Sequence, residues 1–207
     1  LGTGDQFSLA PEQAGTTHPG ADDNASGTAG LLSLARSLAA GPKLRFGVLF
    51  VAFAGEELGL LGSSHYVHHP LLPLGQARLM INMDMIGRVS AGKVAVGGAV
   101  RGSQYRRMLI ELEQKHGLRL DLDDSAVYGS SDHTSFRTKQ VPFLFFFSGL
   151  HADYHRPSDT WDKIDAKGAA KLLNLIGDLI AGLDVETRSR LRNTRGMEPP
   201  TGEMPHP

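Results

Sequence analysis

The sequence predicts an α/β fold in which a mostly parallel sheet carries helices on both faces. Three short apolar runs without polar alternation stand at 46–53 (FGVLFVAF), 79–83 (LMINM) and 141–147 (VPFLFFF), and such runs are typical of strands buried on both faces. Amphipathic helical patterns surround these runs. Strands that alternate with helices favour a parallel sheet, which binds its ligands at the carboxyl ends of its strands.

Helices are expected at both ends of the predicted domain. The first is predicted over 24–40, where leucines recur at three- and four-residue steps, and Asp23 or Asn24 suits its N-cap. Gly41 and Pro42 are a stop signal. The last helix is predicted over 166–183, with an apolar stripe along one face. Shorter helices are expected at 58–67, 104–116 and 131–139, and a short strand at 93–96.

Composition narrows the classes of function. Lys plus Arg number 21 and Asp plus Glu number 22, which leaves a formal net charge of −1, so the chain has no basic excess for nucleic acid. The 207 residues include no cysteine, which excludes disulfides, thiolate zinc sites and iron–sulfur clusters. Any metal must be held by His, Asp and Glu. The chain has no apolar run of the ~18 residues that predict a membrane span.

The length suggests one domain with a large core. We place this domain at residues 1–187, and its first 23 residues, which lack periodicity, are expected to form a long surface loop. From residue 188 the composition shifts to Arg, Pro, Gly and Glu. Residues 188–207 are therefore predicted to be a disordered tail.

Polar residues follow the predicted buried strands at the points where ligands would bind. Glu56 and Glu57 follow the first strand, Asp84 follows the second, and His155 lies in the loop after the third. Asp23 lies in the loop that enters the first helix. Each alone has a simpler explanation, such as an N-cap for Asp23, an Asx turn for Asp84 or a solvated helix start for the glutamates. Together they predict one site at the edge of the sheet.

The adjacent glutamates are the most informative of these residues. Two neighbouring carboxylates at the end of a buried strand repel each other and raise a pKa unless a cation compensates them. One glutamate can bind a dication while the other stays free as a base that takes a proton from metal-bound water. Oxygen and imidazole ligands without thiolate suit zinc, manganese or cobalt, and zinc is the usual choice for hydrolysis.

Five segments in a fixed order then resemble the co-catalytic zinc aminopeptidases of metallopeptidase family 28. The segments are HPGADDNASG (18–27), FAGEELGLLGS (53–63), NMD (82–84), SDHTSF (131–136) and YHRPSDT (154–160). The resemblance implies a three-layer α/β/α sandwich with a mixed, mostly parallel sheet, as in zinc exopeptidases with a phosphorylase/hydrolase-like fold.

The resemblance also implies a role for each residue of the site. Asp23 would bridge two zinc ions, Glu57 and His155 would complete one zinc site, and Asp84 would belong to the other. Glu56 would be the general base that activates a metal-bound water.

Other residues of these segments have less definite roles. Asp132 would be a carboxylate behind the ligands or beside the substrate, or else an N-cap for the helix at His133. Asp159 would be structural and would steady the loop of His155. A group of three histidines, His65, His68 and His69, is expected to face solvent at a helix end.

The resemblance implies a zinc-dependent exopeptidase that hydrolyses the N-terminal peptide bond of a peptide with a free N-terminus. One alternative is a glutaminyl cyclase-like acyltransferase, because relatives of similar fold hold a single zinc through an Asp, a Glu and a His. Another is a non-catalytic, receptor-like relative. Family resemblance favours a location outside the cytoplasm, secreted or periplasmic.

One family segment has no counterpart in this chain. The family carries a His-x-Asp segment whose His binds the zinc of the Asp84 site, and we find no such segment here. We therefore expect the opening strands of the domain to be absent. The full domain would hold two zinc ions, whereas this chain would form one good site, from Asp23, Glu57 and His155, and would have weak or no peptidase activity.

Overall fold

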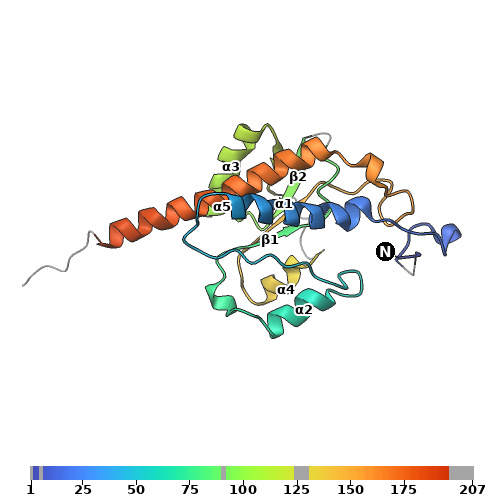
Figure 1. Ribbon diagram of the computed structural model, residues 1–207, viewed down its shortest axis with the longest axis horizontal. Coiled ribbons are helices and arrows are strands. Elements are labelled where there is room, and N and C mark those ends of the chain that lie inside the picture. The colour runs from blue at the N-terminus through green and yellow to red at the C-terminus, as the bar shows by residue number, and fades with distance from the viewer. Residues whose placement is uncertain (1, 5–6, 90–91, 124–130, 196–207) are drawn as a thin grey trace, which may run out of the picture.

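A four-stranded mixed sheet lies at the centre of the molecule, between two groups of helices (Figure 1). The computed structural model describes residues 2–4, 7–89, 92–123 and 131–195, with side chains as far as residue 184. The α/β/α architecture predicted from the sequence is confirmed. The strands are β1 (Met80–Met83), β2 (Lys93–Gly97), β3 (Arg119–Asp121) and β4 (Phe143–Phe147). The α-helices are α1 (Gly27–Ala40), α2 (Leu61–His68), α3 (Gln104–His116), α4 (His133–Thr138) and α5 (Ala166–Arg195).

The strand order is β1-β4-β2-β3. β1 runs parallel to β4, β2 runs parallel to β3, and β2 is antiparallel to β4. In the parallel pair, Met83 lies opposite Phe146, so β1 and β4 end at the same edge of the sheet. The segments that follow these two strands therefore start close together, and they carry Asp84 and His155.

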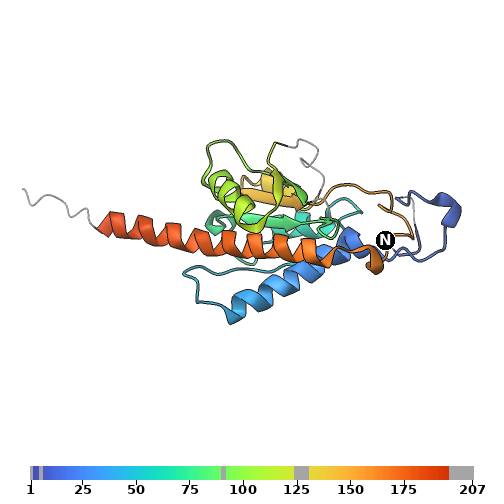
Figure 2. The same cartoon turned by 90° about the horizontal axis from the view of Figure 1, so that it is seen from above.

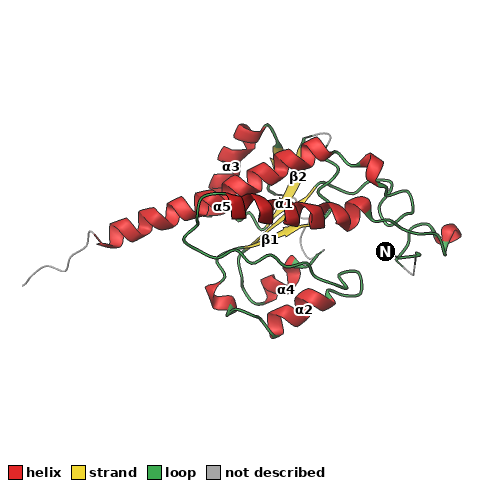
Figure 3. Cartoon of the chain, viewed as in Figure 1, coloured by secondary structure: helices red, strands yellow, loops and turns green. Residues whose placement is uncertain are grey.

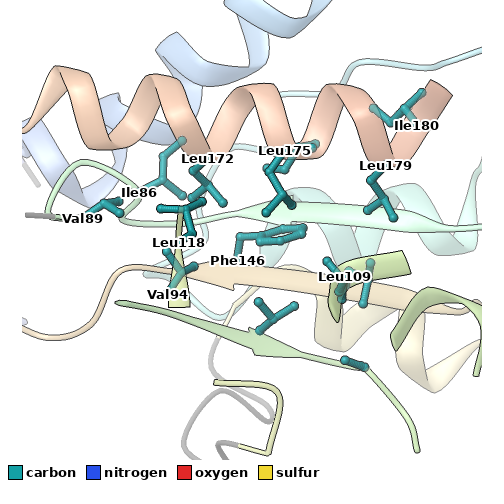
Figure 4. Packing of buried hydrophobic residues seen from close by; sticks show 14 of the residues in the cluster. Ile86, Val89, Val94, Leu109, Leu118, Phe146, Leu172, Leu175, Leu179 and Ile180 are labelled. Carbon is teal, nitrogen blue, oxygen red and sulfur yellow. The ribbon is translucent and has the colours of Figure 1, made fainter. Parts of the chain in front are cut away.

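The larger hydrophobic core lies where α1, α3 and α5 pack against the sheet. Figure 2 shows α5 running along the sheet with α1 beside it. The side chains of Leu172, Leu175 and Leu179 point from α5 towards Phe146 of β4 (Figure 4), and all four are fully buried. Such a residue typically contributes ~1.5–3 kcal/mol by leaving water. This core holds the two site-bearing strands in place.

A smaller core covers the opposite face of the sheet. Here α2 packs against α4, and Val67, Phe136 and Val141 are buried between them. Phe53 joins this core, since its ring centroid lies 6.0 Å from that of Tyr66 and 5.9 Å from that of Phe136. Glu56 and Glu57 follow Phe53 by three and four residues in the chain, so the packing of Phe53 holds the start of the loop that carries both glutamates.

The run at 46–53 is not a strand, so this part of the prediction is wrong (Figure 3). A strand exists only where a neighbour completes its hydrogen-bond ladder, and none of β1–β4 pairs with this run. Phe50 and Phe53 still pack onto the two cores, whereas Val48 and Leu49 are 38% and 49% exposed. The apolar composition indicates a tendency to be buried but does not supply a pairing partner.

Helix α5 continues beyond the end predicted from the sequence. It reaches Arg195, so residues 188–195 of the predicted disordered tail are helical and that part of the prediction is wrong. The stretch contains no Gly or Pro before Gly196, and Arg and Leu are good helix formers. Residues 196–207, the rest of the predicted tail, lie outside the described residues.

The first helix begins later than expected, at Gly27 instead of residue 24. The turn at Ala21–Ser26 comes before it, and the Oδ1 atom of Asn24 accepts the N–H of Gly27 at 2.9 Å. The opening loop is only partly exposed, because Ala10 and His18 are buried. The short strand β3 was not predicted. Among the described helices, none combines the length and hydropathy that crossing a membrane requires.

Candidate metal centre

Three side chains from distant parts of the sequence converge on one point. Asp23 comes from the turn before α1, Glu57 from the loop before α2, and His155 from the loop after β4. One ligand atom of each lies within 4.8 Å of those of the other two. The Nε2 atom of His155 is 3.1 Å from Asp23 Oδ2 and 3.1 Å from Glu57 Oε1. The structure thus brings together the three residues that the resemblance assigns to one zinc site.

The opening loop sets the orientation of the His155 ring. The Nδ1 atom of His155 donates to the backbone oxygen of Phe7 at 2.8 Å, and the His155 oxygen accepts the N–H of Leu9 at 3.0 Å. Figure 1 shows this opening segment beside the loop that follows β4. A proton held on Nδ1 leaves Nε2 as the atom that binds metal. Tyr154 also covers the ring, with a centroid separation of 3.8 Å.

The donor set fits a zinc ion. Asp23 Oδ2 and His155 Nε2 are buried and lie 3.1 Å apart, yet neither makes a hydrogen bond of acceptable geometry. Buried polar atoms without partners are costly, and two ligands directed at a shared ion explain the arrangement. Carboxylate oxygens and imidazole nitrogen are among the ligands that zinc takes from proteins, and a catalytic zinc has three protein ligands and an open fourth position.

Without a cation, His155 and Glu56 would be protonated at neutral pH. Burial alone would lower the pKa of His155, but the carboxylates of Asp23 and Glu57 raise it to about 10. Burial raises the pKa of Glu56 to about 8, with further contributions from Asp84 and Glu57. A divalent cation would replace these protons, because it neutralises the same negative charge.

Asp84 lies beside the three converging residues, at the end of β1. Burial raises its pKa to about 7, a hydrogen bond from Ser131 lowers it, and the charge of Asp23 raises it. Ser131 Oγ donates to Asp84 Oδ2 at 2.7 Å, and Asn82 Nδ2 donates to Ser131 Oγ at 2.9 Å. The other oxygen of Asp84, Oδ1, is buried without a hydrogen bond. Asp84 therefore has one oxygen that is fixed by a hydrogen bond and one buried oxygen without a hydrogen bond.

Asp132 sits at the edge of this acidic group and is 9% exposed. Asp132 stands at the N-cap position of α4, as the alternative expects, but its side chain makes no capping hydrogen bond to this helix. Burial raises its pKa and a hydrogen bond with Ser63 lowers it. Its charge in turn contributes to the raised pKa values of Glu56 and Asp84. Asp132 is thus close enough to Glu56 and Asp84 for its charge to act on them.

The sequence reasoning missed the residues that orient these ligands. The Phe7 oxygen and the Ser131 hydroxyl act on His155 and Asp84 from segments far away in the chain. Ser131 begins the SDHTSF segment, and the resemblance of this segment to the family is the one sequence signal that points to Ser131. No feature of the sequence around Phe7 marks its carbonyl. The exposure predicted for His65, His68 and His69 is confirmed.

Comparisons with known proteins found similar sequences over most of this chain. A sequence profile described as "Peptidase family M28" matches residues 5–180. Aminopeptidase YwaD of Bacillus subtilis is 33% identical over 173 residues, which are 78% of this chain and 36% of that protein.

Solved structures share the fold. The zinc aminopeptidase BSAP from Bacillus subtilis matches with a TM-score of 0.69 and 31% identity, over 80% of this chain and 42% of that one. A glutaminyl cyclase from Porphyromonas gingivalis matches with a TM-score of 0.67 at 18% identity, over 85% of this chain and 67% of that one, which shows the common fold alone. The chain spans less than half the length of the two Bacillus subtilis relatives.

Proposed function

Since this chain belongs to peptidase family M28, we propose that it carries the zinc-binding centre of an aminopeptidase, which releases the N-terminal residue of a peptide. One observation carries the proposal. Asp23, Glu57 and His155 present ligand atoms within 4.8 Å of one another, and Glu56 directly precedes Glu57 in the chain. This arrangement combines a metal site with a separate carboxylate that is available as a base.

Asp23, Glu57 and His155 would hold the zinc ion. Zinc in such a site acts as a Lewis acid that polarises the scissile carbonyl and lowers the pKa of water. The hydrogen bond from His155 Nδ1 to the Phe7 oxygen keeps Nε2 directed at the ion. The partly enclosed position of the three ligands limits the access of bulk water, which strengthens the electrostatic interactions inside the site.

Glu56 would move the proton during hydrolysis. It would take a proton from the attacking water and deliver it to the amine that leaves. Burial, Asp84 and Glu57 raise its pKa to about 8, and a general base works best when its pKa lies near the operating pH. A zinc ion would bring this value down from the one set by the carboxylates alone.

Asp84 would contribute to a second zinc position, with Asp23 between the two ions. In the part of the chain that the structure describes, only one group of three metal-binding residues is found. Two carboxylates make a weaker zinc site than three ligands that include an imidazole. We therefore propose that this chain holds one zinc ion tightly and a second one weakly, if at all.

A peptide with a free N-terminus would be the substrate, and its amine would lie near the carboxylates of the site.

A glutaminyl cyclase-like reaction is the second candidate. It is favoured by the single three-ligand group of an Asp, a Glu and a His. The EELGLLGS segment at 56–63 resembles the peptidase version and favours hydrolysis. A peptide with N-terminal glutamine separates the two reactions, because a cyclase gives a cyclised peptide and an aminopeptidase releases free glutamine.

The test of the proposal combines turnover with metal content. We expect the zinc-loaded chain to release N-terminal residues slowly, as detected by mass spectrometry over hours. The variant Glu56→Gln should lose this release and keep its zinc, since Glu56 is not among the three ligands. Glu12→Gln, an exposed glutamate in the opening loop, is the matched control. Equal release by Glu56→Gln and the unaltered chain, or release that does not depend on zinc, would contradict the proposal.

A further inference from the structure

One fully buried carboxylate joins the two loops that carry metal ligands. Asp159 lies four residues after His155 and is 0% exposed. Its Oδ2 atom accepts the backbone N–H of Asp22 at 2.9 Å and that of Asp23 at 3.1 Å. Its backbone oxygen also accepts the N–H of Ala21 at 3.2 Å. The loop of His155 is thus hydrogen-bonded to three successive peptide groups around Asp23.

The other side of Asp159 is held by a cation. Its Oδ1 atom lies 3.3 Å from Nη2 of Arg88, and the same Nη2 lies 3.2 Å from Oδ2 of Asp153. The guanidinium side chain is 18% exposed. A buried carboxylate that is paired with a cation and accepts several hydrogen bonds keeps a fixed orientation. Asp159 therefore acts as a rigid connection and not as a mobile side chain.

Asp22 adds a second fixed point to the same turn. Its Oδ1 atom accepts the N–H of Gly87 at 2.6 Å, and its Oδ2 atom lies 3.0 Å from Nε2 of His151. Asp22 is fully buried. The contacts of Asp22 and Asp159 determine the path of the backbone at Asp23, and this path sets the direction of the Asp23 side chain.

We propose that Asp159 is a positioning residue that fixes the Asp23 backbone relative to His155 and thereby sets the affinity of the site for zinc. The inference rests on the proposed zinc site. Asp159 touches neither the ion position nor the ligand atoms of Asp23 and His155. It acts because the spacing of ligand atoms in a metal site tolerates only small errors, and partners behind the ligands typically change metal affinity by roughly 10- to 100-fold.

Asp153 offers a matched control. It shares Arg88 with Asp159 and also pairs with Lys163, whereas the backbone N–H groups of Asp22 and Asp23 donate to Asp159 and not to Asp153. Asp153→Asn therefore disturbs the same cation and leaves the hydrogen bonds to Asp22 and Asp23 in place. If Asp159 acts through those two N–H groups, the two variants will differ.

The experiment compares the 207-residue chain with Asp159→Ala, Asp159→Asn and Asp153→Asn. Zinc affinity is measured by competition with a chromophoric chelator, the absorption spectrum of the Co²⁺-loaded chain reports ligand geometry, and circular dichroism of the zinc-free chain reports folding. We expect Asp159→Ala to fold, to bind zinc roughly 10- to 100-fold more weakly and to show an altered Co²⁺ spectrum. Asp159→Asn keeps an oxygen that accepts both N–H groups, but hydrogen bonds to a neutral oxygen are about half as strong as those to a carboxylate, so we expect zinc affinity to fall by about threefold, less than in Asp159→Ala, with the spectrum retained.

The control should keep the zinc affinity of the unaltered chain. The inference is overturned if Asp159→Ala folds and binds zinc with unchanged affinity and spectrum, or if Asp153→Asn weakens binding equally. If Asp159→Ala does not fold, Asp159→Asn decides alone, and an unchanged zinc affinity overturns the inference. Failure of the unaltered chain to bind zinc would instead contradict the proposed function.

Discussion

Asp84→Asn should stabilise the zinc-free chain at pH 8 and leave its stability unchanged near pH 4. The pKa of Asp84 rises from 3.8 to about 7 on folding, mainly because burial disfavours the ionised form. The hydrogen bond from Ser131 lowers this pKa, and the charge of Asp23 raises it. The folded chain thus binds this proton more tightly than the unfolded chain does. Its free energy of unfolding therefore falls as the pH rises from about 4 towards 8. Asparagine has no charge and avoids this loss.

The size of the effect follows from the pKa interval. The difference between 3.8 and about 7 corresponds to an upper limit of roughly 4 kcal/mol at about 1.36 kcal/mol per pKa unit. Neighbouring carboxylates share the protons of the cluster, so we expect about half of this, ~2 kcal/mol at pH 8. For a chain of this size that gain raises the Tm by about 4–8 °C.

Urea unfolding with a chelator present, at pH 4 and pH 8, measures this gain. Asp123→Asn is the control, because Asp123 is exposed and its hydrogen bond with Arg106 lowers its pKa. That variant should not gain stability at pH 8. The reasoning is refuted if Asp84→Asn is neutral or destabilising at pH 8, or if it gains as much at pH 4.

Three further predictions follow from the site and the core. Zinc binding at pH 7 should release protons, because the carboxylates raise the pKa of His155 to about 10 without a cation; calorimetry in two buffers of different ionisation enthalpy measures the number, and zero would contradict the proposed ligand. Ser131→Ala removes the hydrogen bond to Asp84 Oδ2, so the pKa of Asp84 should rise further. The zinc-free chain should then lose about 1 kcal/mol of stability at pH 8, where Asp84 is ionised. This contribution should be absent at pH 4, where Asp84 is protonated. Phe146→Ala leaves a cavity between β4 and α5, where Phe146 is fully buried, and should lower the free energy of unfolding by about 3–5 kcal/mol; a loss under 1 kcal/mol would show that this packing matters little.

Local patterns in the sequence were enough to find most of the elements. Helix α3 has the predicted bounds of 104–116, and β4 lies inside the predicted run at 141–147. The run at 46–53 failed because its hydrophobicity does not say which strand lies beside it. The pattern does not predict the end of α5, because a composition of Arg, Pro, Gly and Glu is typical of disorder, although Arg is a good helix former.

For the candidate site too, the sequence predicts the ligands but not the contacts that orient them. The resemblance identifies Asp23, Glu57 and His155 as ligands of a common ion. Of these three, only His155 lies after a strand of the described sheet, β4, where the rule for parallel sheets predicts functional residues. The contacts that orient them were not identifiable. The hydrogen bonds of Phe7 with His155 and of Asp159 with the Asp23 turn join residues more than 130 positions apart. Such contacts depend on how loops meet after folding, and no local pattern encodes them.

The zinc content of the 207-residue chain tests the central claim most directly. The chain is loaded with zinc, dialysed against zinc-free buffer and analysed for metal per chain, together with His155→Ala and with His69→Ala, an exposed histidine that serves as the control. We predict one tightly held zinc in the unaltered chain and in His69→Ala, and none in His155→Ala. Two tightly held ions, no ion at all, or an ion that survives the loss of His155 would contradict a single site built from Asp23, Glu57 and His155.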